Sequence, residues 1–356
     1  MQGFTQETTV TSSRILLLLI LLFFGYVIKK NKTKIDTITK NTFLFGGYLS
    51  IVTLFDLGLN ANGLSNIFSV FLWIIVFRQI SCMIIDDRHL YIVALIMSFM
   101  CNVLSFIYIF NLASQISYME HLTGIAAINS IYYIFISFPF VFLFRNWLLS
   151  IIFSIFPFYA FITSGKTTCI LCGGVILLYY IIQKVKNNKL SSRVLLLLVL
   201  VFLFGVLISF IDLNSIIDNT QSDFNSGGNG RFSIYSKVWN LLIYESSVFS
   251  ILFGHGVDAI SRTIGIGGHN DFLEILYCYG IIGLFLFIVF LSNMVKEVKL
   301  LKNHVIRMSY IISLIILFFA LLASKMIATQ IGLLPLSIFW GTLFANNKYN
   351  KLRRNN

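Results

Sequence analysis

One histidine stands where the chain changes from polar to apolar, and its position suits proton transfer. His269 follows the glycine-rich segment 265–268 and precedes a long apolar run. An imidazole there can take a proton from a hydroxyl near neutral pH. The free amide groups of a helix that starts at this point also favour a nearby phosphate. His269 is therefore a candidate general base.

Two acids come directly after this histidine. Asp271 and Glu274 are three residues apart, which is the spacing of a capping box at the start of a helix. Carboxylates at this end also face the positive end of the helix dipole. We predict a helix that begins near residue 271, with Asp271 as its cap and Glu274 folded back onto it. On this interpretation both acids have a structural role.

His269 lies at the end of the one long polar segment of the chain, residues 212–270. This segment also carries Arg231 and Arg262. Within this segment, residues 232–245 are predicted to form an amphipathic helix that lies on the membrane surface or on the helix bundle. Its apolar face is expected to hold Phe232, Tyr235, Val238, Trp239, Leu242 and Ile243. Arg231 stands at the start of this helix, either as a site residue or as a solvated loop charge.

The elements that must position these residues are membrane helices. Hydrophobic residues make up 58% of the 356 residues and charged residues 11%, unlike a soluble domain. A crossing needs about 20 apolar helical residues, and the chain offers about eleven such runs. We predict an all-α integral membrane protein, with residues 1–356 as one domain. The predicted spans are 12–28, 41–59, 66–85, 90–110, 122–144, 147–163, 167–183, 194–211, 271–295, 308–323 and 330–346.

The orientation follows from the positive charges, because Lys and Arg concentrate in cytoplasmic loops. With the amino terminus outside, 19 of the 26 Lys and Arg residues lie inside and six outside. The net charge of +12 therefore indicates membrane topology and no nucleic-acid partner. The polar segment 212–270 is then periplasmic, in a bacterial inner membrane, with the carboxyl terminus cytoplasmic. An enzyme at that face must use an already activated substrate, such as a lipid-linked sugar.

Other chemistry finds little support in the sequence. Cys169 and Cys172 have metal or redox spacing, but no second pair completes a zinc site, so we predict neither metal nor cofactor. Segment 165–167 reads Gly-Lys-Thr without the upstream glycine of a nucleotide-binding loop. Asp56, near the outer end of the second span, could face a lipid-lined cleft. His255, between two glycines, is expected to be a turn residue.

An ordered set of motifs in and after the polar segment resembles a known superfamily. The motifs are Gly230-Arg231, then Trp239, then Phe253-Gly254-His255-Gly256-Val257, then Gly268-His269-Asn270-Asp271-Phe272-Leu273-Glu274, then Tyr279-Gly280-Ile281-Ile282-Gly283-Leu284. Together they are similar to the Wzy-type O-antigen polymerase and O-antigen ligase superfamily, which are polytopic glycosyltransferases of the GT-C type. The detailed match covers about 55 residues, and the expected topology agrees over most of the chain.

The resemblance implies a substrate and a role for each site residue. Undecaprenyl-pyrophosphate-linked oligosaccharide would donate the glycan, and its pyrophosphate would be bound by Arg231, Lys166, Arg262, Asn270 and Lys325. His269 would orient or deprotonate the acceptor hydroxyl, with Asp271 or Glu274 as its partner or substitute. The family tends to carry Ser-Arg where this chain has Ser164-Gly165-Lys166. Lysine keeps the charge there but loses the two-pronged grip on phosphate.

Three functions remain open at this point. A polymerase would join repeat units on lipid carriers, with a chain-length regulator and a flippase of the same pathway as partners. A ligase would move finished glycan onto a lipid A core with much the same site. A transporter or flippase would favour internal repeats and broken or charged helices at mid-membrane. The sequence shows no clear repeat and few charges within spans, which ranks the transporter third. The compact, Phe- and Ile-rich chain has no recognisable lipid-core site, which favours the polymerase over the ligase.

Overall fold

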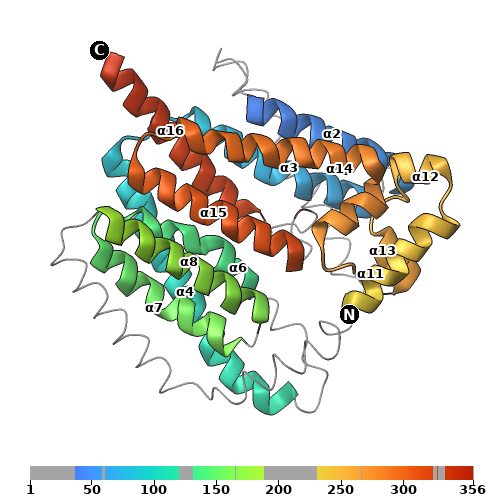
Figure 1. Ribbon diagram of the computed structural model, residues 1–356, viewed down its shortest axis with the longest axis horizontal. Coiled ribbons are helices and arrows are strands. Elements are labelled where there is room, and N and C mark those ends of the chain that lie inside the picture. Colours follow the sequence, from blue (N-terminus) through green and yellow to red (C-terminus); the bar gives the residue numbers. More distant parts are fainter. Residues whose placement is uncertain are drawn as a thin grey trace. The chain divides into compact units, whose positions relative to one another are not determined.

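A computed structural model describes residues 37–57, 61–119, 131–164, 166–187, 231–265, 267–323, 327 and 333–355. All regular elements within these ranges are helices, as the composition predicts (Figure 1). The α-helices are α2 (Thr37–Leu57), α3 (Ala61–Cys82), α4 (Asp87–Met119), α6 (Ile131–Ser137), α7 (Trp147–Thr163), α8 (Thr167–Asn187), α11 (Arg231–Asn240), α12 (Val248–Phe253), α13 (Ala259–Ile264), α14 (Asp271–Glu297), α15 (His304–Ala323) and α16 (Leu334–Asn355). Two short 3₁₀ segments, η1 (Phe138–Leu143) and η3 (Val298–Leu300), and a π-helical turn, η2 (Leu241–Glu245), complete the set.

Several helices are apolar enough to lie in a bilayer. Three segments have the length and hydropathy to cross a membrane, namely Asp87–Phe110, Asp271–Leu300 and His304–Ala323. Four apolar helices are shorter, namely Phe71–Cys82, Ile131–Leu143, Trp147–Thr163 and Thr168–Gln183. Three helices of spanning length and four shorter apolar ones are consistent with a multi-pass membrane protein. The predicted spans 12–28 and 194–211, and residues 212–230 of the polar segment, lie outside the described residues.

The chain divides into two compact units, and each is described by itself. Unit 1 comprises Met1–Leu90, Arg231–Lys302 and Ala320–Asn356, and unit 2 comprises Tyr91–Gly230 and Asn303–Phe319. In unit 1, α2 packs against both α3 and α14, and α16 packs on α3 (Figure 1). Aromatic pairs join α14 to α2 and to α3, and large rings bury much apolar area at such contacts. Phe45 stacks on Phe287 at 5.5 Å, and Trp73 meets Phe290 at 5.7 Å.

Unit 2 shows how a proline inside a helix is accommodated. Pro157 lies within α7 and has no N–H to donate to the carbonyl of Phe153, four residues earlier. The side-chain amide of Asn102, on α4, donates to that carbonyl at 2.8 Å. Asn102 also donates to the carbonyl of Ser98 at 2.8 Å. A polar side chain in an apolar helix thus satisfies the acceptor that the proline leaves open.

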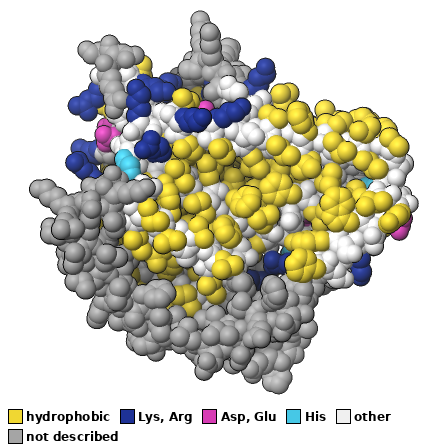
Figure 2. Space-filling view, in the orientation of Figure 1, with side chains coloured by type: hydrophobic (Ala, Val, Ile, Leu, Met, Phe, Trp, Pro, Cys, Tyr) yellow, Lys and Arg dark blue, Asp and Glu magenta, His cyan; other side chains and the backbone are white. Residues whose placement is uncertain are grey.

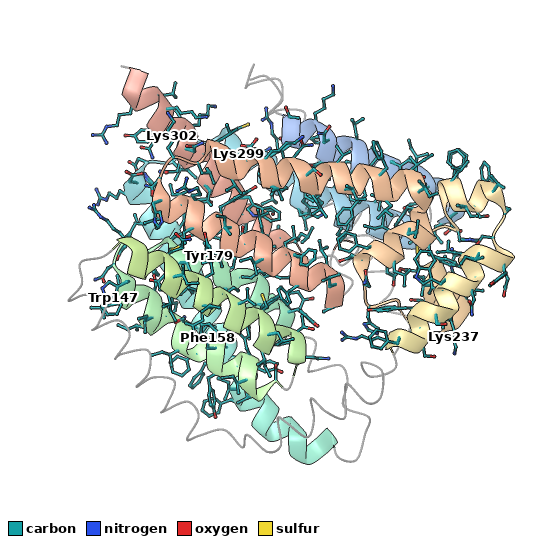
Figure 3. All side chains as sticks on the ribbon, viewed as in Figure 1. Trp147, Phe158, Tyr179, Lys237, Lys299 and Lys302 are labelled. Atoms are coloured by element: carbon teal, nitrogen blue, oxygen red, sulfur yellow. The ribbon has the colours of Figure 1, made fainter. Side chains whose placement is uncertain are left out.

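The exposed side chains of α14 change in type along the helix. In the middle of α14 the exposed side chains are Ile281, Phe285 and Ile288. At its carboxyl end the exposed side chains are Lys296 and, just beyond the helix, Lys299. Figure 2 shows hydrophobic side chains over this helix and Lys and Arg beside its carboxyl end, where Figure 3 labels Lys299. An apolar band with a basic end is consistent with a helix that crosses a membrane.

A break in α14 determines where the turn after α12 docks. Gly280 has φ 68° and ψ −173°, which is not helical, so carbonyl groups just before it need partners outside the helix. The backbone N–H of His255 donates to the carbonyl of Tyr277 at 3.0 Å, and that of Gly256 donates to the carbonyl of Cys278 at 3.0 Å. The hydroxyl of Tyr48, from α2, donates to the carbonyl of Tyr279 at 2.9 Å. The turn after α12 and one tyrosine therefore cap the break.

The close approach of α12 and α14 requires glycine on both sides. Gly254, at the end of α12, and Gly280 both have positive φ, of 92° and 68°. A methyl group on Gly254 would overlap the carbonyl of Cys278, and one on Gly280 would overlap the carbonyl of Leu252. Both neighbours are backbone atoms, which cannot move aside as a flexible side chain can. Two glycines of the resemblance motifs thus have a structural reason.

We predict that Gly280→Ala destabilises the protein by more than about 2 kcal/mol, because this backbone conformation is almost confined to glycine and the methyl group has no room. Thermal unfolding of the detergent-solubilised chain would show a lowered Tm. Gly47→Ala is the matched control, since a methyl group there meets nothing within 4 Å and alanine favours the surrounding helix by about 1 kcal/mol. Equal Tm values for Gly280→Ala and the wild type would contradict this account of the break.

Candidate functional site

The turn that caps the break is also held by an ion pair. Asp56, near the end of α2, accepts a hydrogen bond from the backbone N–H of Val257 at 2.8 Å. The guanidinium of Arg262, on α13, donates to both carboxylate oxygens of Asp56 at 3.2 and 2.8 Å. Arg262 also donates to the carbonyl of His255 at 3.2 Å. One acid on α2 thus fixes both the turn and α13.

This ion pair changes the interpretation of two residues. Asp56 binds the turn and Arg262, and the expectation that it also faces a lipid-lined cleft stays a prediction. Arg262 was predicted to bind pyrophosphate, and its two-pronged grip holds a carboxylate of the protein instead. Pyrophosphate binding by Arg262 stays a prediction, but the observed contacts indicate a positioning role. Sequence reasoning missed the pair because its partners are 206 positions apart.

His255 lies in the turn, as expected, and makes two side-chain contacts there. Its Nε2 shares a hydrogen bond with the hydroxyl of Ser246 at 2.7 Å. Its ring stacks on Tyr277 with centroids 4.4 Å apart and planes 17° from parallel. Burial lowers the pKa of His255 below its usual value, because a charged imidazole loses hydration there. His255 is therefore neutral near pH 7 and acts as a packing residue of the turn.

The start of α14 carries the predicted His269 motif. The helix begins at Asp271, as predicted, but its cap is Asn270, so the prediction that Asp271 caps it is wrong. The side-chain oxygen of Asn270 accepts from the N–H groups of Phe272 at 2.9 Å and Leu273 at 3.2 Å. The residue before the first helical turn has the extended backbone that lets a short side chain reach back to these donors. Asn270 was predicted to bind substrate, and capping occupies its side-chain oxygen.

Both acids of the motif are buried and hydrogen-bonded to backbone groups. Asp271 is 1% exposed and Glu274 is 4% exposed. Glu274 accepts from the N–H of Gly268 at 2.7 Å, and the thiol of Cys278 donates to its other oxygen at 3.6 Å. The N–H of Ile327 lies 3.4 Å from an Asp271 oxygen. These contacts give both acids a structural role other than the predicted capping box, and they leave two carboxyl groups close to His269 in the chain.

His269 itself has a strained backbone. Its φ is +49°, in the left-handed region that glycine favours, and its side chain is partly exposed. Such a conformation costs of order 1–3 kcal/mol outside glycine and persists where the surroundings fix it. Here the bond from Gly268 to Glu274 and the cap at Asn270 fix the residues on both sides. The strain marks His269 as a residue whose position is determined by its neighbours.

Arg231 is the first residue of α11, as predicted, and is half-buried. The amphipathic helix predicted over 232–245 is present as α11 followed by the π-helical turn η2. Its apolar face is split, with Val238 and Leu242 buried and Phe232, Trp239 and Ile243 exposed. Residues of α11 contact α13 and α14 within unit 1. Arg231 therefore belongs to the same unit as His269.

Lys166 and Lys325 are the other two cations predicted to bind pyrophosphate. Lys166 precedes α8 in unit 2, and its backbone N–H donates to the hydroxyl of Ser164 at 3.2 Å. Lys325 lies outside the described residues. Their roles at the pyrophosphate stay predictions. Among the described residues, no group of three or more His, Cys, Asp and Glu side chains is placed to hold a metal ion.

A scan against models of known protein families finds none that matches this chain, and a search of curated proteins finds no similar sequence.

We predict that Asp56→Asn and Arg262→Gln each lower the Tm by an amount equivalent to about 1 kcal/mol, the usual scale for a partly exposed pair. The double variant should lose little more, because either change already removes the ion pair. Thermal unfolding of the four proteins measures this coupling. Asp86→Asn, in the exposed pair with His89 at 2.7 Å, is the matched control and should change the Tm little. Additive effects of the two substitutions would contradict the pairing.

We also predict that His255 makes the protein less stable in acid. A histidine whose folded-state pKa is lowered stabilises the fold fully above its unfolded pKa of about 6.5. As the pH falls through that value, the unfolded chain binds the proton first and the stability decreases. The Tm of the wild type should therefore fall more between pH 7.5 and pH 5.5 than that of His255→Gln, which cannot titrate there. Parallel curves for the two proteins would refute this role.

Proposed function

We propose that the protein is a surface-polysaccharide polymerase of the O-antigen type, which acts in lipopolysaccharide biosynthesis. It would transfer a growing glycan from undecaprenyl pyrophosphate to the terminal sugar hydroxyl of a lipid-linked repeat unit. The observation that carries the proposal is how the resemblance motifs meet on α14. The Gly-His-Gly turn caps the break at Gly280, and His269 stands at the capped start of the same helix. Motifs that are separate in the sequence thus contribute to one helix, α14.

The proposed topology is a bundle of about eleven transmembrane helices with the amino terminus outside. Segment 212–270 would form a periplasmic loop over the bundle. The exposed lysines at the carboxyl end of α14 support this orientation, since they lie at the end opposite His269. His269 would then act at the periplasmic face, where lipid-linked glycans are available and nucleotide sugars are not.

The proposed reaction is a displacement at the anomeric carbon of the donor glycan. The acceptor hydroxyl oxygen forms the new bond while the bond to the pyrophosphate oxygen breaks, and the electron pair leaves with the pyrophosphate. His269 takes the hydroxyl proton, and attack opposite the leaving group inverts the anomeric centre. Arg231 stabilises the charge that grows on the pyrophosphate. Lys166 and Lys325 are proposed as further cations for it.

In this proposal, the buried acids act on His269 indirectly. Glu274 binds the N–H of Gly268, the residue before His269, and Asn270 caps the helix on the other side. The imidazole is thereby held at a fixed place relative to α14. Arg262 belongs to the same support, because its pairing with Asp56 holds the turn against the break. Preorganised groups of this kind lower a barrier without reorganising during the reaction.

The polysaccharide ladder of a strain that lacks the gene tests the function. A single repeat unit on the lipid core is expected for a polymerase. No glycan on the core would instead indicate the ligase, whose site would be much the same. A ladder of unchanged length would refute both.

Arg231→Ala and His269→Ala test the site in the same strain. Each should reduce polymerisation about 100-fold or more, the usual scale for losing one transition-state contact. Arg145→Ala and His89→Ala are matched controls, because both residues are exposed and lie outside the proposed site. Full-length polymer from Arg231→Ala or His269→Ala protein that inserts normally would overturn the site assignment.

A further inference from the structure

A pocket that is open to the surface lies within unit 1. It has a volume of about 350 Å³ and is formed by α11, η2 and α13. Its lining consists of Lys237, Asn240, Leu241, Glu245, Thr263 and Ile264. Figure 3 labels Lys237 where it projects from α11. A pocket of this volume is at the small end of the range for sites that bind small ligands.

The π-helical turn shapes one wall of this pocket. Lys237, Leu241 and Glu245 follow one another at intervals of four residues. In a regular α-helix each such interval turns the side-chain direction by about 40°, so Glu245 would point well away from Lys237. The wider π turn over Leu241–Glu245 offsets much of the rotation in the second interval, and Glu245 lines the same pocket as Lys237 and Leu241. Such turns occur frequently at functional sites. The wall is therefore a specific feature of this segment.

The lining has the chemistry that a sugar ring requires. Lys237 can only donate hydrogen bonds, Glu245 can only accept them when ionised, and Asn240 and Thr263 can do both. Leu241 and Ile264 add apolar surface for the C–H groups of a ring. Lys237 and Glu245 form neither of the two ion pairs found among the described residues. Donors and acceptors beside apolar side chains match the hydroxyl and C–H groups of a pyranose.

The pocket is also close to His269 along the chain. Ile264 ends α13 and is five residues before His269. Five residues span at most about 18 Å, which a short oligosaccharide can bridge. A glycan whose reacting hydroxyl is at His269 can therefore place another of its rings in the pocket.

We propose that this pocket binds one sugar ring of the glycan, away from the reacting hydroxyl. The proposal rests on the proposed function and adds a residue set that selects the repeat unit. Lys237, Asn240, Glu245 and Thr263 are binding residues and take no part in the displacement. Their loss should weaken binding of the glycan, which raises KM and leaves kcat unchanged.

Binding of a free oligosaccharide separates this proposal from the catalytic one. The probe is the repeat-unit oligosaccharide released by mild acid from the surface polysaccharide of the producing strain. It lacks pyrophosphate, so Arg231→Ala should bind it as the wild type does. Titration of the full-length protein in lipid nanodiscs measures Kd by calorimetry. Lys237→Met and Glu245→Gln should each raise Kd about tenfold, the scale of one hydrogen bond to a charged group.

Lys299→Met is the matched control for Lys237→Met, since both lysines are exposed and only Lys237 lines the pocket. Asn240→Ala is a second pocket variant, and equal Tm values would show that all variants fold. Equal Kd values for the wild type and the pocket variants would overturn the pocket and leave the polymerase intact. A wild type that polymerises but does not bind the probe would do the same. A chain that neither binds nor polymerises would overturn both proposals.

Discussion

The carbonyl groups that the break in α14 leaves without donors inside the helix are the constraint on which the rest of unit 1 depends. In an apolar helix an unsatisfied backbone carbonyl costs several kcal/mol, so the break persists only if other groups supply donors. The backbone of His255 and Gly256 and the hydroxyl of Tyr48 supply them. The turn must therefore dock against α14, and the two glycines permit the approach. A requirement of α14 thus fixes where the turn after α12 lies.

The same logic extends outward from the turn through charged groups. Once the turn is docked, Asp56 is close enough to accept from Val257 and to pair with Arg262. That pairing anchors α13, which leads into the segment before His269. At the helix start, Glu274 and Asn270 fix the backbone on either side of the histidine. Each polar group forms hydrogen bonds with the next group or positions it, and His269 is the last residue in this series of contacts.

The sequence predicted those parts of the structure that local pattern controls. The span 147–163 is α7 with the same ends, and α14 begins at residue 271 as expected. The length of the apolar run and the polar residues at its ends determine the bounds of both helices. Neither set of bounds depends on a residue that is distant in the sequence. Whether Asn270 or Asp271 caps α14 was misjudged, because both are good capping residues and the choice depends on where Asp271 is buried. The burial of Asp271 depends on tertiary packing, which residue spacing along the chain does not reveal.

Long-range polar contacts were beyond the sequence for a related reason. Nothing in the local pattern around Asp56 distinguishes an acid that pairs with Arg262 from one that faces a cleft. The motif that contains Gly280 drew attention as a pattern of glycines, but its structural role is evident only from the turn docked against it. The cations therefore separate into two groups. Arg262 is used by the fold, whereas Arg231 and Lys237 lie on α11 at the proposed site and pocket, where they can serve a ligand without weakening the support of His269.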